Sequence, residues 1–248
     1  MKGRTILLTG GLGSLGRAQA EAFVAAGAQV VVLDRADAGD ARAAIQGIAQ
    51  AGPGKVDYMQ QDLADLEGAR AAIAALAEAQ GGIDVLINNA ALIVNRPFEQ
   101  FSLAEYEEQM RVNVGAAFAL AQAVAPSMKA KGAGAIVNFC SVTLSGEWDG
   151  YVPYVTSKGG MLGLTKGLAR ELGAFGIRVN AVSPGAVVSD AEERIFGDRA
   201  AAYAAWVLGR QCLKNRIQAG DIAAAVLFLA GDGARMISGH VLEVDAGW

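Results

Sequence analysis

The stretch that decides the fold is RTILLTGGLGSLG, residues 4–16. Its apolar run predicts a short buried strand over Arg4–Thr9, and an amphipathic helix is expected from about Leu15 to Ala26. A glycine turn between a strand and a helix lets backbone N–H groups and the positive end of the helix approach a pyrophosphate. The chain contains 32 glycines, so a glycine turn alone is weak evidence for dinucleotide binding. The motifs that follow it make that interpretation specific.

An acidic residue follows the next predicted strand. The apolar run Gln29–Leu33 ends at Asp34, eighteen residues beyond Gly16. A carboxylate at this position can accept hydrogen bonds from the adenosine ribose hydroxyls. The same charge repels a 2′-phosphate, so the sequence predicts NAD rather than NADP as the cofactor.

Three later predicted strands also end at polar or glycine residues. Asp62-Leu63 follows Lys55–Gln60, Asn88–Ala91 follows Asp84–Ile87, and Ser183-Pro184-Gly185 follows Ile177–Val182. Open parallel sheets bind their ligands at these carboxyl ends. Regular strand–helix repeats without a linker predict one doubly wound α/β domain of the Rossmann type over residues 1–248. We expect a seven-stranded parallel sheet with helices on both faces.

Ser141, Tyr154 and Lys158 combine a hydroxyl, a phenol and an amine near the middle of the chain. Tyr154 and Lys158 are four residues apart and therefore share one face of a helix. A phenol, with a pKa of about 10, is too weak a base at neutral pH, but a neighbouring cation stabilises the phenolate and lowers that pKa. The pair is therefore a candidate catalytic base, although in isolation such a pair more often belongs to a solvated helix face.

Taken together, these motifs resemble the short-chain dehydrogenases/reductases over nearly the whole length, from Thr5 to Trp248. The resemblance implies that Tyr154 is the general base, that Lys158 lowers its pKa and holds the nicotinamide ribose, and that Ser141 orients the substrate oxygen. It also implies that Asn113 anchors a water in a proton relay; simple capping or packing is the alternative role for that residue.

The same resemblance implies a set of cofactor-binding residues: Gly10, Gly13, Ser14, Leu15, Gly16, Asp34, Arg35, Asp62, Leu63, Asn89, Ala90, Tyr154, Lys158, Pro184, Gly185, Val187 and Ser189. The chain departs from the family pattern where Ser14 replaces a glycine of T-G-x-x-x-G-x-G, where Ala91 ends N-N-A-G, and where Ser189 replaces the usual threonine. Residues 11–16 also match G-x-G-x-x-G, so the register of the phosphate turn is open by one residue.

Composition excludes several other classes of protein. A net charge of −4 without a basic stripe argues against nucleic acid as a partner. No apolar run reaches the ~18 residues of a membrane span, and no signal peptide is evident, which predicts a cytoplasmic protein. The two cysteines, Cys140 and Cys212, predict a reducing compartment. The single histidine, His240, is expected to be structural, and no metal site is predicted.

Two predicted helical regions, Leu103–Lys131 and Pro153–Ala174, are apolar on more than one face. Such faces indicate burial against something other than the sheet. The resemblance implies that these helices form a subunit interface of a homotetramer. Tight packing within a monomer is the alternative.

Three segments are expected to form the substrate pocket: Leu92–Arg96, Glu147–Asp149 and the loop Ala186–Arg216. Asn95, Arg96, Glu147, Trp148 and Asp149 offer hydrogen bonds and a stacking face suited to a polyhydroxylated ring, and the candidate substrate residues are Asn95, Ser141, Trp148 and Tyr154. Residues 211–217 and 245–248 are similar to those of bacterial sugar 1-dehydrogenases of the D-xylose and L-rhamnose type.

The sequence therefore predicts oxidation of a small-molecule substrate, an aldose, at its anomeric hydroxyl to the lactone, with NAD as acceptor. One alternative is an NADPH-dependent reductase, for example of a 3-oxoacyl thioester, because Arg17 and Arg35 could neutralise a 2′-phosphate. The second alternative is a non-catalytic protein that binds the dinucleotide.

Overall fold

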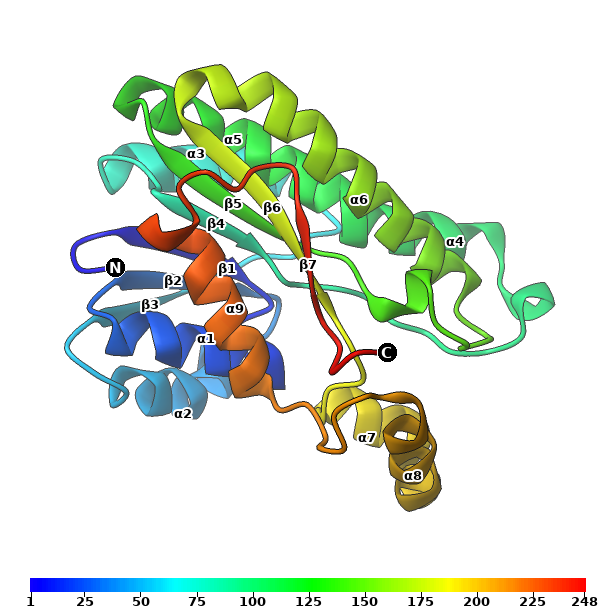
Figure 1. Ribbon diagram of the computed structural model, residues 1–248. Coiled ribbons are helices and arrows are strands. Elements are labelled where there is room, and N and C mark those ends of the chain that lie inside the picture. The colour runs from blue at the N-terminus through cyan, green and yellow to red at the C-terminus, as the bar shows by residue number, and fades with distance from the viewer.

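The structure, a computed structural model, describes residues 1–248. Its centre is one seven-stranded sheet in the order β3-β2-β1-β4-β5-β6-β7, with every neighbouring pair parallel. Helices cover both faces of the sheet (Figure 1), which confirms the predicted doubly wound fold. The strands are β1 (Thr5–Thr9), β2 (Gln29–Asp34), β3 (Lys55–Gln60), β4 (Val85–Asn88), β5 (Gly134–Phe139), β6 (Ile177–Pro184) and β7 (Val241–Val244).

Burial on both faces explains why the central strands, such as β1, β4 and β5, are mostly apolar runs. Successive side chains of a strand point to opposite faces. In β1, Ile6 and Leu8 belong to one hydrophobic core and Leu7 to the other. The helices that pack into these cores are α1 (Ser14–Ala25), α2 (Ala38–Ala49) and α9 (Ala219–Ala230) on one face, and α3 (Leu66–Ala79), α5 (Ala116–Lys131) and α6 (Val152–Leu172) on the other.

The helical region predicted over Leu103–Lys131 is not one regular helix. It comprises α4 (Leu103–Met110), a π-helical segment over Arg111–Gly115, and α5. A π-helical turn inserts an extra residue into the ladder of hydrogen bonds and redirects the side chains around it. Asn113 lies within this turn and is buried.

The strand ends position the candidate site. Asn88 is the last residue of β4 rather than part of the following loop, and β6 extends through Pro184. The strand order reverses between β1 and β4, and such a reversal opens a crevice at the carboxyl ends of the strands. Helices α7 (Asp190–Phe196) and α8 (Ala200–Arg210) lie at this end of the sheet (Figure 1). None of the helices has both the length and the apolar character that crossing a membrane requires.

Candidate active site

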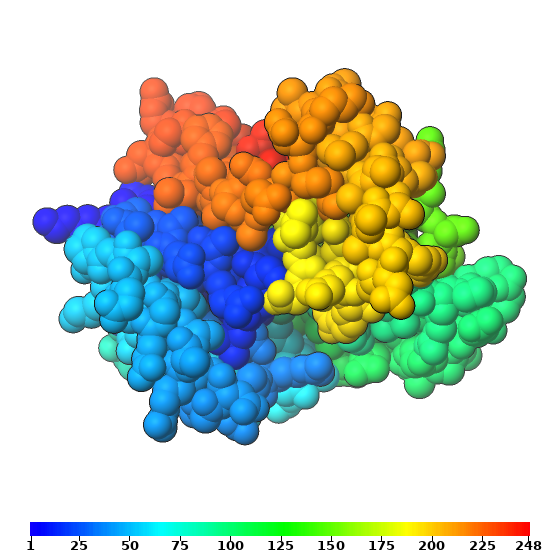
Figure 2. All heavy atoms as spheres, turned by 90° about the horizontal axis from the view of Figure 1, so that it is seen from below, coloured from blue at the N-terminus to red at the C-terminus, as the bar shows by residue number.

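A cavity of about 610 Å³ occupies the crevice. Figure 2 shows this end of the molecule, where the yellow-to-orange segment that holds α7 and α8 lies between the blue N-terminal part and the green middle of the chain. Every residue predicted to bind the dinucleotide lines the cavity: Gly10, Gly13, Ser14, Leu15, Gly16, Asp34, Arg35, Asp62, Leu63, Asn89, Ala90, Tyr154, Lys158, Pro184, Gly185, Val187 and Ser189.

The glycine turn packs closely against its own backbone and against the segment after β4. Gly10 has a φ of +65°, and a Cβ there would lie 2.8 Å from the Cα atom of Ala90. A Cβ on Gly16 would lie 2.2 Å from the carbonyl oxygen of Gly10, whereas one on Gly13 would meet no atom nearer than 3.8 Å. Close packing thus requires glycine at both ends of the turn but not at position 13.

The turn also leaves the positive end of α1 open. Gly13 is the N-cap of α1 and supplies no side-chain cap, so the amides of the first turn remain available to an anion. Asn89 braces the turn from β4, because its Nδ2 donates to the carbonyl oxygens of Thr9 (2.9 Å) and Gly10 (3.1 Å). These features fit the diphosphate of a nicotinamide dinucleotide.

Asp34 is fixed at the end of β2 by two backbone donors. Its Oδ2 accepts from the N–H of Leu12 (3.2 Å) and its Oδ1 from the N–H of Arg35 (2.8 Å). The carboxylate therefore faces the glycine turn, where it can accept from ribose hydroxyls. The Arg35 side chain is exposed and lines the same cavity.

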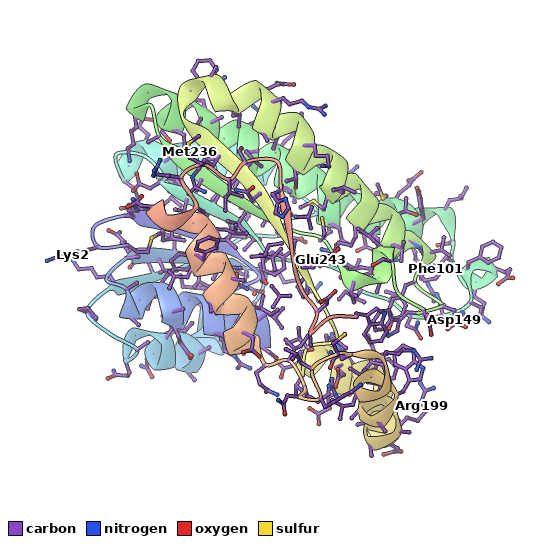
Figure 3. All side chains as sticks on the ribbon, in the orientation of Figure 1. Lys2, Phe101, Asp149, Arg199, Met236 and Glu243 are labelled. Atoms are coloured by element: carbon purple, nitrogen blue, oxygen red, sulfur yellow. The ribbon has the colours of Figure 1, made fainter.

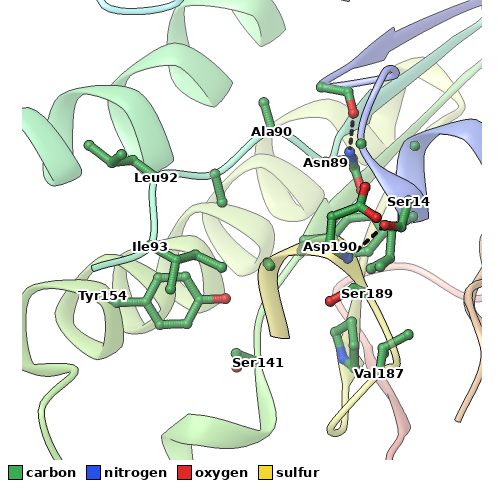
Figure 4. Close-up of a pocket in the computed structure, with 18 of the residues that line it drawn as sticks. Ser14, Asn89, Ala90, Leu92, Ile93, Ser141, Tyr154, Val187, Ser189 and Asp190 are labelled. Atoms are coloured by element: carbon green, nitrogen blue, oxygen red, sulfur yellow. Dashed lines mark hydrogen bonds between the residues drawn. The ribbon is translucent and has the colours of Figure 1, made fainter. Parts of the chain in front are cut away.

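Ser141, Tyr154 and Lys158 lie together at the other end of the cavity, and each is buried. Tyr154 and Lys158 come from the first turns of α6, while Ser141 follows β5. Figure 4 shows Tyr154 and Ser141 in the cavity wall. The Nζ atom of Lys158 donates to the carbonyl oxygen of Phe139 (2.9 Å) and lies 5.4 Å from the centre of the Tyr154 ring.

Burial dominates the titration of this pair. It raises the pKa of Tyr154 to about 12, and the Ser141 hydroxyl offsets only part of that rise. Burial also lowers the pKa of Lys158 to about 8, against an opposing effect of Cys140. The expectation of a phenol pKa below 10 is not met in this structure, because loss of solvation raises it and the Ser141 hydroxyl offsets only part of that rise.

Asn113 stands behind the cavity rather than in its wall. Its Oδ1 accepts from the N–H of Leu92 (2.7 Å), and its Nδ2 donates to the carbonyl of Leu92 (3.0 Å) and to the Oγ of Ser157 (2.9 Å). The amide is satisfied and joins the π-helical turn to the loop after β4 and to α6. The relay role implied by the resemblance remains a prediction.

Of the polar loop residues expected around a substrate, only Trp148 lines the large cavity. It stacks on Trp248 with ring centres 4.3 Å apart and meets Trp206 edge-on at 5.3 Å. We call Trp148, Trp206 and Trp248 the tryptophan cluster. The Nε1 of Trp148 donates to the hydroxyl of Tyr203 (3.2 Å), which also lines the cavity.

The candidate Asn95 does not line the large cavity, and its role at a substrate stays a prediction. It lines a smaller neighbouring cavity of about 350 Å³, and its amide donates to the carbonyl of Asp149 (3.0 Å). Glu147 forms an ion pair with Arg210 (2.8 Å), and Arg96 pairs with Glu105. These groups are held by protein partners that the sequence does not reveal.

The lid, which we define as residues 186–216, contributes cavity residues that sequence reasoning missed. Glu192, Arg194, Phe196 and Tyr203 line the cavity together with Tyr151. Glu192 forms a largely buried ion pair with Arg216. Asp149 and Arg199 flank the same end of the molecule (Figure 3). No sequence signal marks the ion pair, because its members are 24 residues apart in a segment without periodicity.

Comparisons with known proteins agree with this geometry. A family model described as enoyl-(acyl carrier protein) reductase matches residues 10–248. D-Xylose 1-dehydrogenase of Caulobacter vibrioides is 38% identical over 100% of this chain and 96% of its own length. A probable galactose dehydrogenase of Rhizobium meliloti is 35% identical over 100% and 95%. A structure of a putative NAD(P)-dependent gluconate 5-dehydrogenase from Beutenbergia cavernae, with bound NADP, superposes with a TM-score of 0.92 at 35% identity, over 100% of this chain and 97% of that one.

Proposed function

The chain belongs to the short-chain dehydrogenase/reductase family, and from that premise we propose that it oxidises an aldose at the anomeric hydroxyl to the lactone with NAD as acceptor. It is an oxidoreductase, and sugar dehydrogenases are among its full-length relatives. The finer assignment is supported by the 38% identity to a D-xylose 1-dehydrogenase and by the chemistry of the cavity.

One observation carries the proposal: the Ser141 hydroxyl lines the same cavity as Tyr154 and is held in place by Thr143. Its Oγ accepts from the N–H of Thr143 (3.2 Å) and lies 2.9 Å from the Oγ1 of Thr143. A hydroxyl can rotate its proton toward either neighbouring oxygen, so Ser141 can donate to a substrate oxygen inside the cavity. A donor at this point stabilises the charge that develops on an alcohol oxygen as its proton leaves.

The other residues supply the proton chemistry. A bound nicotinamide dinucleotide would supply the hydride acceptor. As the carbinol hydrogen leaves as hydride with both electrons of the C–H bond, the hydroxyl proton must pass to a base within about 2.6–3.2 Å. We assign that role to Tyr154, which lines the cavity with Ser141. Lys158, with a pKa of about 8, can hold or release a proton close to neutral pH.

Asp34 supports NAD in preference to NADP. Its carboxylate is anchored by two backbone N–H groups and faces the position of the adenosine ribose in the family fold. A negative charge there accepts from ribose hydroxyls and repels a 2′-phosphate.

The test is the initial rate of NADH formation against pentoses, hexoses, polyols and simple secondary alcohols, with mass spectrometry of the product. We expect the highest kcat/KM with an aldose and a lactone, or its hydrolysed acid, as product. Activity confined to aliphatic alcohols, with none on any sugar or polyol, would contradict the substrate assignment and leave the dehydrogenase assignment intact.

A second candidate is an NADPH-dependent carbonyl or 3-oxoacyl thioester reductase. The exposed Arg35 in the cavity wall and the NADP bound in a similar structure favour it. The same assay run in reverse, with NADPH and a 3-oxoacyl thioester, separates the two candidates. A protein that binds the dinucleotide but turns over no substrate in either direction would be a non-catalytic member of the family.

A further inference from the structure

Ser14, which replaces a glycine of the family turn, makes a direct bond to the lid. Its Oγ accepts from the backbone N–H of Asp190 at 2.9 Å (Figure 4). Ser14 is the first residue of α1 and Asp190 the first residue of α7. An exposed ion pair between Arg17 and Asp190 (3.3 Å) joins the same two helices. The lid thus rests on the end of α1 that the glycine turn leaves open.

This contact leaves the proton of the Ser14 hydroxyl without an acceptor in the protein. A serine hydroxyl has two acceptor lone pairs and one O–H donor. Asp190 occupies one lone pair, and Ser14 donates to no protein atom. Ser14 is partly exposed and lines the large cavity between Gly13 and Leu15. Its proton is therefore free for a ligand oxygen at the open end of α1.

We propose that the Ser14 hydroxyl couples the lid to the dinucleotide, donating its proton to a diphosphate oxygen while it accepts the N–H of Asp190. The proposal rests on the dinucleotide assignment made above. The diphosphate then helps to hold α7 in place, and α7 helps to hold the diphosphate, through one side chain. Such coupling is reciprocal, so each raises the affinity for the other by the same factor. A glycine at this position could make neither bond.

Two substitutions, Ser14→Gly and Ser14→Ala, test the bond to the ligand. ADP and adenosine share the adenosine half, but only ADP carries a diphosphate. By isothermal titration calorimetry we expect the ADP dissociation constant to rise about tenfold in both variants, as for the loss of a hydrogen bond to a charged group. Adenosine affinity should stay within about twofold. Ser127→Ala, on α5 and away from the cavity, is the matched control.

Limited proteolysis of the lid tests the coupling without any turnover. In the wild-type protein ADP should slow cleavage within residues 190–210, because it stabilises the docked lid. In both Ser14 variants, at ADP concentrations that saturate them, the protection should largely disappear. Unchanged melting temperatures without ligand would show that the variants fold normally.

The outcomes separate this inference from the proposed function. Wild-type affinity for ADP in both variants, or undiminished protection of the lid, would refute the role of Ser14 and leave the cofactor assignment standing. Failure of the wild-type protein to bind ADP or NAD would refute the cofactor assignment, and this inference with it.

Discussion

At the scale of single residues, the proposed chemistry rests on Tyr154, which lines the cavity with Ser141 and which we assign as the group that exchanges a proton with the substrate. Tyr154→Phe keeps the ring and removes that oxygen. We expect kcat to fall by at least about 10²-fold, since general acid–base catalysis typically contributes 10²–10⁴-fold. NAD affinity, measured by calorimetry, should change little. A variant with more than about a tenth of the wild-type rate would exclude Tyr154 as the base.

Lys158 has a measurable effect on stability as well as on chemistry. Its pKa is lowered from 10.5 to about 8 in the folded protein, chiefly by burial. Between about pH 8 and pH 10.5 the unfolded chain binds more protons than the folded protein does. The contribution of Lys158 to the free energy of unfolding therefore increases with pH over this range and is lost as the pH falls through about 8.

The difference in free energy of unfolding between the wild-type protein and Lys158→Met isolates the contribution of the lysine. It is needed because the raised pKa values of Cys140, Tyr151 and Tyr154 make those groups lower the stability as the pH rises. From urea unfolding at pH 7, 8 and 9, we expect the wild-type free energy to rise relative to the variant by about 1 kcal/mol between pH 8 and 9. A pH-independent difference would mean that the lysine is not desolvated.

Asp34 offers a test of cofactor choice. Asp34→Ser removes the negative charge and leaves Arg35 exposed in the cavity wall. The NADP/NAD ratio of kcat/KM should rise by at least tenfold, which corresponds to about 1.4 kcal/mol. The control is Glu78→Ser, which removes the same negative charge from the exposed side of α3, away from the cavity. It should leave the ratio unchanged. A wild-type preference for NADP would overturn the assignment.

At the scale of elements, the strand–turn–helix unit depends on Gly16. A Cβ there would lie 2.2 Å from the carbonyl oxygen of Gly10, so Gly16→Ala must push α1 away from β1. We expect a loss of more than about 2 kcal/mol in the free energy of unfolding, as for other overpacked sites, and loss of NAD binding. Gly13→Ala meets only ordinary contacts and should unfold like the wild-type protein. Equal stability of the two variants would contradict the geometry.

The elements themselves could be predicted well from sequence, because the central strands are buried on both faces and leave apolar runs, and the turn leaves its glycines. The edge strand β3 is mixed in character but lies between a glycine and an aspartate. The strand Lys55–Gln60 is correct to the residue. The π-helical turn at Arg111–Gly115 could not be foreseen, because no residue type marks it.

The cofactor end of the candidate site could be predicted better than the substrate end. Cofactor residues follow strand ends, and a parallel sheet gathers strand ends at one edge, so those residues all line the cavity. The partners of loop residues such as Asn95 and Glu147 depend on tertiary packing, so the sequence could not show that they contact Asp149 and Arg210. The sign of the Tyr154 pKa shift was missed because burial cannot be inferred from i,i+4 spacing.

At the scale of the whole molecule, helices α4 to α6 carry large apolar side chains in solvent: Leu103, Phe118 and Val152 are 81%, 49% and 52% exposed. We expect them to be covered in a homotetramer, because exposed apolar groups gathered on one set of helices mark interaction surfaces. Sedimentation should give a mass four times that of the 25.5 kDa chain. Phe118→Glu should lower it, while Arg42→Glu on α2 should not. A wild-type monomer would refute the expectation.

The tryptophan cluster provides an intrinsic spectroscopic probe of the cavity. The chain has three tryptophans, and all three belong to this one cluster of contacting rings, of which Trp148 lines the cavity. Intrinsic fluorescence excited at the red edge of the absorption band therefore originates from this single region, with no background from elsewhere in the fold. Coupling between stacked indoles also gives the region its own near-ultraviolet circular dichroism. Ligand binding and rearrangement of the lid can thus be followed in solution without a label.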